Sequence, residues 1–189
     1  MKKIKAPSEG ELFILEYLKH KNISFEREVR LNNLMFDDDF GYRAVDFYLK
    51  KYKVYIEFNG MWNNTKEDRV RYRKKKEVYR KNNIPCIYLY PENLGIIDFV
   101  FPKRLIEEMK KKSMTKELKL FQLKRFIDDR GSLFAWLILS IILLCGDFNW
   151  QENSTTIMAC IAVSVYQVYR FIKGIYKFFI KNSPEFNMN

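Results

Sequence analysis

Residues 43–60 read RAVDFYLKKYKVYIEFNG and hold two apolar segments joined by a short basic stretch. The segments at 43–49 and 54–58 are rich in aromatic and β-branched side chains, which favour strands, and the connection at 50–53 is short and polar. The pattern predicts a β-hairpin. Asp46 and Glu57 are eleven residues apart around the turn. We expect them to lie nearly opposite one another on adjacent strands, at one end of a sheet.

Further elements are predicted on both sides of this hairpin. Residues 9–19 show helical spacing of apolar side chains after Ser8, which is a good N-cap, and residues 25–31 alternate apolar and charged side chains as a half-exposed strand does. Residues 65–82 are dense in helix formers, and residues 84–90 read as a buried strand. The order predicts an α/β, or α+β, fold in which a small mixed sheet is flanked by helices.

The two carboxylates of the hairpin stand in apolar surroundings, within AVDFY and YIEF. An unpaired carboxylate among buried strand residues is costly, so such a group usually pairs with a cation. Because the chain has one His and three isolated Cys, two converging carboxylates favour a hard ion with oxygen ligands, Mg²⁺ or else Mn²⁺. The alternative is two ordinary ion pairs, Asp46 with Arg43 and Glu57 with a lysine of residues 74–76.

The composition describes a folded and strongly basic protein. The chain has 189 residues, 34 Lys and Arg against 23 Asp and Glu, a formal charge of +11 and 48% hydrophobic residues. This length allows one domain and an appendage. Cys86, Cys145 and Cys160 have no paired spacing, which argues against a disulfide framework and a thiolate zinc site. Walker, Rossmann and nucleophile-elbow patterns are missing from the sequence, so ATP use, redox chemistry and acyl transfer lack support.

The C-terminal part of the sequence is apolar. Residues 131–146 carry no charge, and a second apolar stretch follows at 154–171. We expect two transmembrane helices, about 131–150 and 154–172, in a bacterial-type cytoplasmic membrane. The chain begins without the apolar core of a signal peptide, and basic residues flank the pair on one side. The positive-inside rule therefore predicts that the N-terminal domain and the C-terminus are both cytoplasmic. The alternative is a buried helical hairpin in a soluble protein.

Four pieces of the sequence resemble a known nuclease family. They are SEGE at 8–11, VDFYL at 45–49, IEFNG at 56–60 and KEVYRKNNIPCIYLY at 76–90. In this order they resemble the PD-(D/E)xK, or restriction-endonuclease-like, superfamily, in particular the branch similar to very-short-patch-repair endonucleases. The resemblance covers residues 7–94. It implies a restriction-endonuclease-like fold and Mg²⁺-dependent endonuclease activity on phosphodiester bonds, with DNA favoured over RNA.

The resemblance also implies roles for individual residues. By position, Glu11 is similar to the first-helix acid that helps to hold the metal, Asp46 to the principal metal ligand, and Glu57 to the acid of the (D/E)xK element. The lysine of that element is expected at position 59, where this chain has Asn59. An amide can ligate or orient a water molecule, but it cannot act as a charged acid, base or clamp.

A lysine from the following helix is expected to replace the one missing at position 59. Lys76 is the first choice, and its neighbours at positions 74 and 75 are the fallbacks. The same helix is expected to hold the substrate backbone, because Lys and Arg contacts to phosphates give affinity that does not depend on sequence. The residues expected to bind nucleic acid are Arg69, Arg71, Arg73, Lys74, Lys75, Arg80 and Lys81. Trp62 either stacks on a base or packs within the fold.

These observations predict an order of domains and a function. We expect a nuclease domain at 1–101, a basic amphipathic connecting helix at 102–130 that is broken near 113–115, the two spans within 131–181, and a tail at 182–189. The predicted protein is a membrane-anchored endonuclease with a role in defence against foreign DNA. The alternative is an inactive membrane adaptor that binds nucleic acid or a protein through the same fold. A homodimer or a separate targeting protein is an open alternative for its partners.

Overall fold

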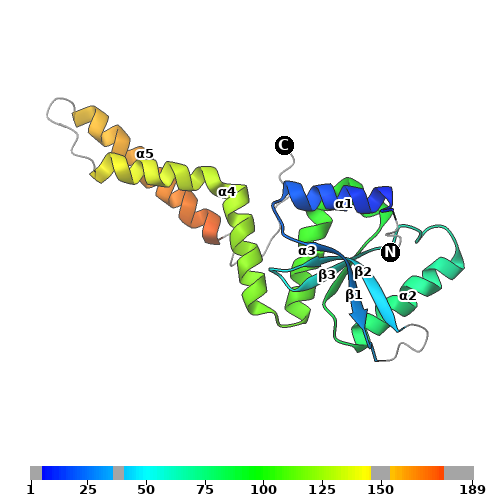
Figure 1. Ribbon diagram of the computed structural model, residues 1–189. Coiled ribbons are helices and arrows are strands. Elements are labelled where there is room, and N and C mark those ends of the chain that lie inside the picture. The colour runs from blue at the N-terminus through cyan, green and yellow to red at the C-terminus, as the bar shows by residue number, and fades with distance from the viewer. Residues whose placement is uncertain (1–5, 36–40, 146–153, 177–189) are drawn as a thin grey trace. The chain divides into compact units, whose positions relative to one another are not determined.

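A computed structural model describes residues 6–35, 41–145 and 154–176 of the chain, which divides into two compact units at residues 1–119 and 120–189. Figure 1 labels its elements. In chain order they are α1 (Glu9–His20), β1 (Glu26–Asn32), β2 (Tyr42–Leu49), β3 (Val54–Phe58), α2 (Lys66–Lys81), β4 (Cys86–Leu89), the 3₁₀ helix η1 (Pro91–Ile96), α3 (Ile97–Lys111), α4 (Thr115–Cys145) and α5 (Ser154–Ile175). The predicted mixed sheet with flanking helices is confirmed.

The sheet has the strand order β1-β2-β3-β4, in which the first two pairings are antiparallel and β3 pairs with β4 in parallel. The predicted hairpin is confirmed as β2 and β3, and its register pairs Phe47 with Ile56. Asp46 precedes Phe47 and Glu57 follows Ile56, so the same antiparallel register brings Asp46 opposite Glu57. The hairpin therefore sets the two acids side by side before any helix is added.

Helices pack around the sheet of the first unit (Figure 1). Val78 and Tyr79 of α2 join Val45 and Cys86 in one buried cluster, which fixes the rotation of α2 about its own axis. The α1 and α3 helices meet through an edge-to-face contact between two aromatic rings, those of Tyr17 and Phe101, whose centroids lie 5.4 Å apart. The predicted N-cap of α1 is confirmed, since Ser8 accepts a hydrogen bond from the Glu11 backbone amide at 3.3 Å.

The predicted connecting helix at 102–130 consists of the end of one helix and the start of the next. Its predicted break is confirmed, because α3 ends at Lys111, Ser113 has a positive φ of 55°, and α4 begins at Thr115. The α3 helix buries Phe101, Leu105 and other apolar side chains, so it belongs to the core of the first unit. The predicted domain boundary at residue 101 falls inside this helix.

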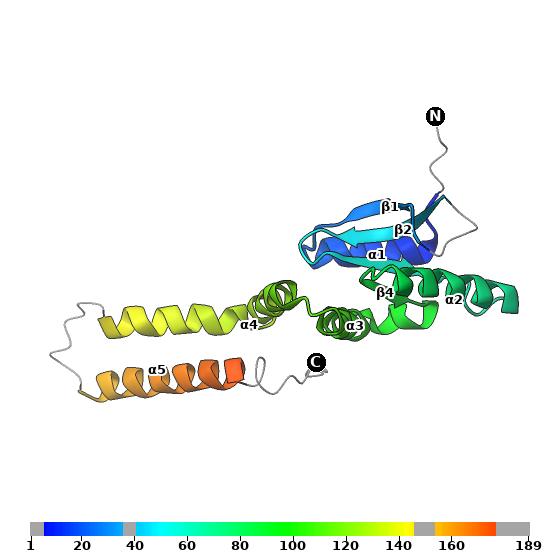
Figure 2. The ribbon, with the colours of Figure 1, turned by 90° about the horizontal axis from the view of Figure 1, so that it is seen from below.

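The second unit contains most of α4 and all of α5, which lie side by side (Figures 1 and 2) and touch through Phe126 and Phe171, whose ring centroids are 6.1 Å apart. Both helices expose large apolar side chains. Those exposed include Trp136, Ile138, Leu139, Ile141 and Ile142 on α4, and Ile161, Val165, Tyr166, Tyr169 and Ile172 on α5.

The two predicted transmembrane helices are not found among the described residues. No helix there is both long enough and apolar enough to cross a membrane. Residues 146–150 of the first predicted span, and the predicted tail at 182–189, lie outside the described residues.

Candidate functional site

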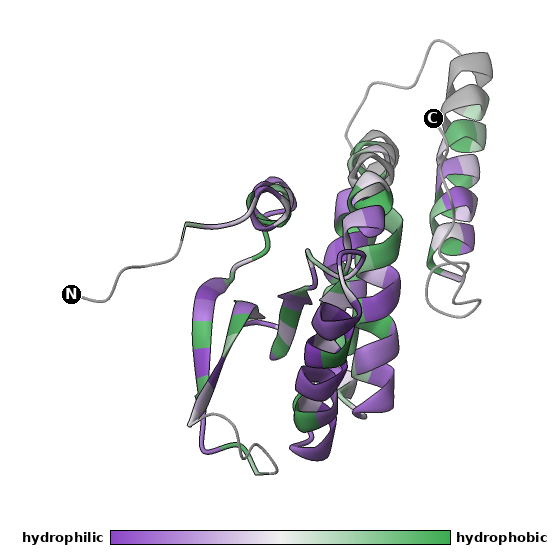
Figure 3. Ribbon diagram, turned by 90° about the vertical axis from the view of Figure 1, so that its right-hand side faces the viewer, coloured by the Kyte–Doolittle hydropathy of each residue, from purple (hydrophilic) through white to green (hydrophobic). Residues whose placement is uncertain are grey.

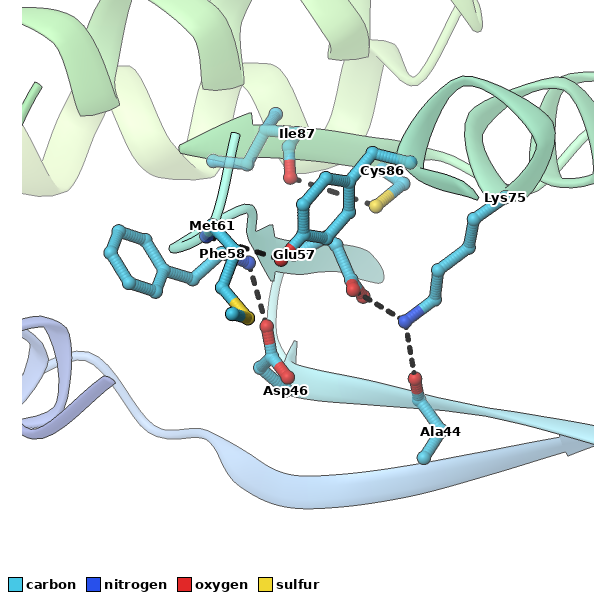
Figure 4. A network of polar contacts seen from close by, with 9 residues as sticks. Ala44, Asp46, Glu57, Phe58, Met61, Lys75, Cys86 and Ile87 are labelled. Carbon is cyan, nitrogen blue, oxygen red and sulfur yellow. Dashed lines mark hydrogen bonds and ion pairs between the residues drawn. The ribbon is translucent and has the colours of Figure 1, made fainter. Parts of the chain in front are cut away.

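The two acids of the hairpin lie at the edge of the core, where β2 and β3 separate (Figure 4). Glu57 is buried, with 4% of its surface exposed, and Asp46 is half-buried. The Phe58 backbone amide donates a hydrogen bond of 2.6 Å to Asp46 Oδ2. This bond fixes the Asp46 carboxylate toward β3, so both acids face the same small volume.

Lys75 of α2 is the cation at these acids. Its ammonium donates to Glu57 Oε1 and, at 2.8 Å, to the carbonyl oxygen of Ala44, and Figure 4 shows it bridging the two strands. The Lys75 side chain is 17% exposed. An ammonium held by a buried carboxylate and a backbone carbonyl is fixed in position, unlike most surface lysines.

Lys76, the expected replacement lysine, points elsewhere. Its ammonium lies 5.1 Å from the ring centroid of Tyr88 and contacts neither acid. Each residue of a helix turns by about 100° from the one before, so adjacent lysines diverge. Lys75 precedes the buried Val78 and Tyr79 by three and four residues and therefore shares their face. That spacing is the signal in the sequence that could have selected Lys75, the fallback, over Lys76.

One oxygen of the pair of acids has no partner. Glu57 Oε2 is buried and accepts no hydrogen bond from the described residues. Leaving a buried carboxylate oxygen unpaired costs free energy, because the oxygen has lost its water without replacement. Such an oxygen is available to a ligand that brings positive charge.

Burial shifts the proton affinities of both acids upward. Desolvation raises the pKa of Asp46 to about 6, against the opposing effects of the Phe58 amide and the Lys75 ammonium. Desolvation and then repulsion from Asp46 raise the pKa of Glu57 to about 8, although Lys75 lowers it. The charge of Lys75 therefore does not offset the desolvation of the two acids. At neutral pH the pair retains a proton that a divalent cation could displace.

The two acids line a pocket of about 440 Å³, which is called the acidic pocket below. Its lining includes the two acids and residues of α1, β2 and α2: Glu11, Gly41, Tyr42, Arg43, Ala44, Asp46, Glu57, Phe58, Arg71, Tyr72 and Lys75. Glu11 Oε2 accepts a hydrogen bond of 3.4 Å from the Ser8 amide, as part of the helix cap. Within the described residues, no three His, Cys, Asp or Glu side chains converge closely enough to form a metal-binding group.

Asn59 continues β3 rather than facing outward. Its backbone amide donates to the carbonyl oxygen of Leu89 at 2.8 Å, and only 2% of its surface is exposed. The positive charge beside Glu57 comes from Lys75 of α2 and not from position 59.

The basic residues of α2 divide between several surfaces, and Figure 3 shows hydrophilic residues along most of this helix. Arg71 lines the acidic pocket and pairs with Asp68 at 3.0 Å, whereas Arg80 lines a second pocket. Lys81 pairs with Glu77 at 3.2 Å. The remaining predicted contacts, Arg69, Arg73 and Lys74, are at least partly exposed.

Trp62 packs within the fold. Its ring centroid lies 5.1 Å from that of Tyr90 in an edge-to-face contact and 6.3 Å from that of Tyr72. The guanidinium of Arg73 lies 5.9 Å from the Trp62 ring centroid. These contacts are those that the packing role requires, and stacking of the partly exposed Trp62 on a base stays a prediction.

Comparisons with protein-family models, with curated proteins and with solved structures found no match for this chain.

Proposed function

We propose that the protein is a divalent-metal-dependent nuclease that hydrolyses phosphodiester bonds, with DNA favoured over RNA as its substrate. The observation that carries the proposal is the pair of carboxylates, half-buried Asp46 and buried Glu57, beside Lys75 and with one unpartnered oxygen in an open pocket. A structural ion pair usually satisfies both oxygens of a buried carboxylate, whereas here Glu57 Oε2 is left for a cation that displaces the proton of the pair.

The residues of the pocket fit a bound Mg²⁺ or Mn²⁺. Mg²⁺ is commonly held by one or two carboxylates, with water and substrate phosphate completing its shell. Asp46 and the unpartnered Glu57 Oε2 supply the carboxylate oxygens, and Glu11 lines the same pocket. When bound, the ion would polarise the phosphate and lower the pKa of an attacking water.

The other groups of the pocket have separate tasks. Lys75 is held within reach of the acids, where its fixed charge would stabilise negative charge that develops on the phosphate. Arg71 lines the same pocket and would bind a neighbouring phosphate of the strand. The acids, Lys75 and Arg71 all belong to the first unit, so the proposed chemistry is complete within it.

The proposal includes membrane association through the second unit. Its support is the set of large apolar side chains exposed on both α4 and α5. Soluble monomeric proteins rarely expose so large an apolar surface to water. Fractionation of cells expressing the full chain tests this: the protein should remain with membranes after a wash at high salt. Recovery in the soluble fraction would contradict membrane association and leave the nuclease proposal untouched.

The test of the activity is cleavage of nucleic acid by the full chain. We expect nicking or cutting of supercoiled plasmid with Mg²⁺ or Mn²⁺, none with EDTA, and a loss of at least about 10³-fold in Asp46→Asn/Glu57→Gln. The matched control is Asp98→Asn/Glu92→Gln, which changes two acids outside the pocket lining. Binding of nucleic acid without cleavage by the wild type would instead support the inactive adaptor.

A further inference from the structure

A second pocket lies against α2, away from the acids, between α2, β4 and α3. Its volume is about 480 Å³. Five of its lining residues are cations, namely Lys76, Arg80, Arg104, Lys111 and Lys112. Two are acids, Glu107 and Glu108, so the pocket carries an excess of three positive charges.

None of these five cations forms an ion pair with an acid in the described part of the chain. Elsewhere in the first unit, lysines pair readily, as Lys50 does with Glu26 and Lys53 with Glu117. Gathering five cations around one volume that holds only two acids is unfavourable, and the cost is relieved when an anion binds. The missing partner of these cations is therefore expected to come from outside the described chain.

Three of the cations are held in place by other contacts. The Arg104 guanidinium donates to the Tyr88 carbonyl oxygen and lies 5.4 Å from the ring centroid of Tyr90. The Lys112 ammonium donates to Asn83 Oδ1 at 2.6 Å. Lys76 is held over the Tyr88 ring, as described above. Cations fixed before a ligand arrives lose little conformational entropy on binding it.

We propose that this pocket, called the basic pocket below, binds the phosphate backbone of a nucleic-acid strand at a point separate from the acidic pocket. Two observations favour a nucleic acid over a small anion. The rings of Tyr88 and Tyr90 line the pocket beside the cations, and aromatic and basic side chains together are typical of single-strand contacts. The same helix, α2, also carries Lys75 and Arg71 into the acidic pocket. The identity of the ligand rests on the proposed function, whereas the anion site does not.

The experiment is a salt titration of binding between the full chain and a fluorescently labelled single-stranded oligonucleotide, in EDTA to prevent cleavage. The pocket variant is Arg80→Gln/Lys111→Gln, since neither side chain forms an ion pair with described residues. The control is Lys51→Gln/Lys119→Gln, which removes the same charge from exposed positions outside the pocket.

We expect the pocket variant to bind on the order of tenfold more weakly and to lower the slope of log affinity against log salt by about 0.7 for each cation removed. The control should keep the wild-type slope. Arg80→Lys/Lys111→Arg, which retains both charges, should restore binding and excludes a folding defect.

Equal losses in the pocket variant and the control, or no loss in either, would overturn the proposal. So would loss of binding to vesicles of anionic phospholipid with oligonucleotide binding intact, because the pocket would then recognise lipid headgroups. Cleavage by the wild type is scored separately. A wild type that binds through the basic pocket but never cleaves would refute the nuclease and not the basic pocket.

Discussion

Two adjacent lysines of α2, Lys75 and Lys76, lie on different sides of the helix and have different surroundings. Lys75 is bound to a buried carboxylate in a pocket whose acids and cations are equal in number, whereas Lys76 lies over an aromatic ring in a pocket where cations outnumber acids. The pocket at the two acids offers a cation the unpartnered Glu57 Oε2, and the basic pocket offers an anion its excess of positive charge. A metal ion and a phosphate backbone would satisfy both, which is why one helix is central to the account.

The largest effect that separates the two sides concerns the adjacent lysines. Lys75→Met should lower the rate of nucleic-acid cleavage by about 10²-fold or more, because it removes the fixed positive charge that would stabilise the reacting phosphate. Lys76→Met should change the rate less than about threefold at saturating substrate and act mainly on affinity. Cleavage rates over a range of substrate concentrations check this. Equal loss of maximal rate in both variants would remove the distinction between the two sides.

A second effect concerns the proton that the acids retain. Because the pKa of Glu57 is raised to about 8 and that of Asp46 to about 6, Mg²⁺ must displace protons to bind at neutral pH. Affinity for Mg²⁺ should rise by about tenfold per pH unit between pH 6 and 8, and level off above the pKa of Glu57. Calorimetry in buffers of different ionisation enthalpy measures the released proton. An affinity for Mg²⁺ that does not vary with pH would contradict competition between Mg²⁺ and protons for the two acids.

The smallest effect is on stability without metal. The pKa of Asp46 is raised in the folded state, from 3.8 to about 6, so the folded protein binds more protons than the unfolded chain in this range. Its stability should therefore fall as pH rises from about 4 to about 6, and the deficit should persist above that. Asp46→Asn should stabilise the protein in EDTA at pH 8 by about 1–3 kcal/mol and by much less at pH 4.

Thermal unfolding of both proteins across this pH range measures the difference. Asp98→Asn, at an exposed position that pairs with Lys21 at 2.8 Å, is the control for loss of an ordinary surface acid and should not stabilise. Destabilisation by Asp46→Asn at pH 8 would mean that the carboxylate is already compensated in the metal-free protein.

The sequence predicts the part of the site that depends only on the alternation of side chains along the two strands. Alternation along residues 43–58 sets which side chains share a face, and the short turn sets the register, so Asp46 and Glu57 could be placed opposite one another. The break between α3 and α4 was predictable for a similarly local reason, at Ser113.

The parts that the sequence does not predict depend on contacts between elements. Whether Lys75 or Lys76 reaches the acids is decided by the rotation of α2, which the burial of Val78 and Tyr79 against β4 fixes. Of the basic pocket, the sequence indicates Arg80 as a nucleic-acid contact but does not predict the pocket itself. Its cations come from α2, from α3 and from Lys112 directly after α3, and they are brought together only when both helices pack beside β4.

The most direct test of the central claim is a titration of Mn²⁺ into the full chain, with free Mn²⁺ measured by electron paramagnetic resonance. The account predicts Mn²⁺ binding by the wild type at pH 8 that is lost in Asp46→Asn/Glu57→Gln and retained in Lys76→Met. Equal Mn²⁺ binding by the wild type and by the variant without the two acids would contradict it, because the acids would then not form a metal site.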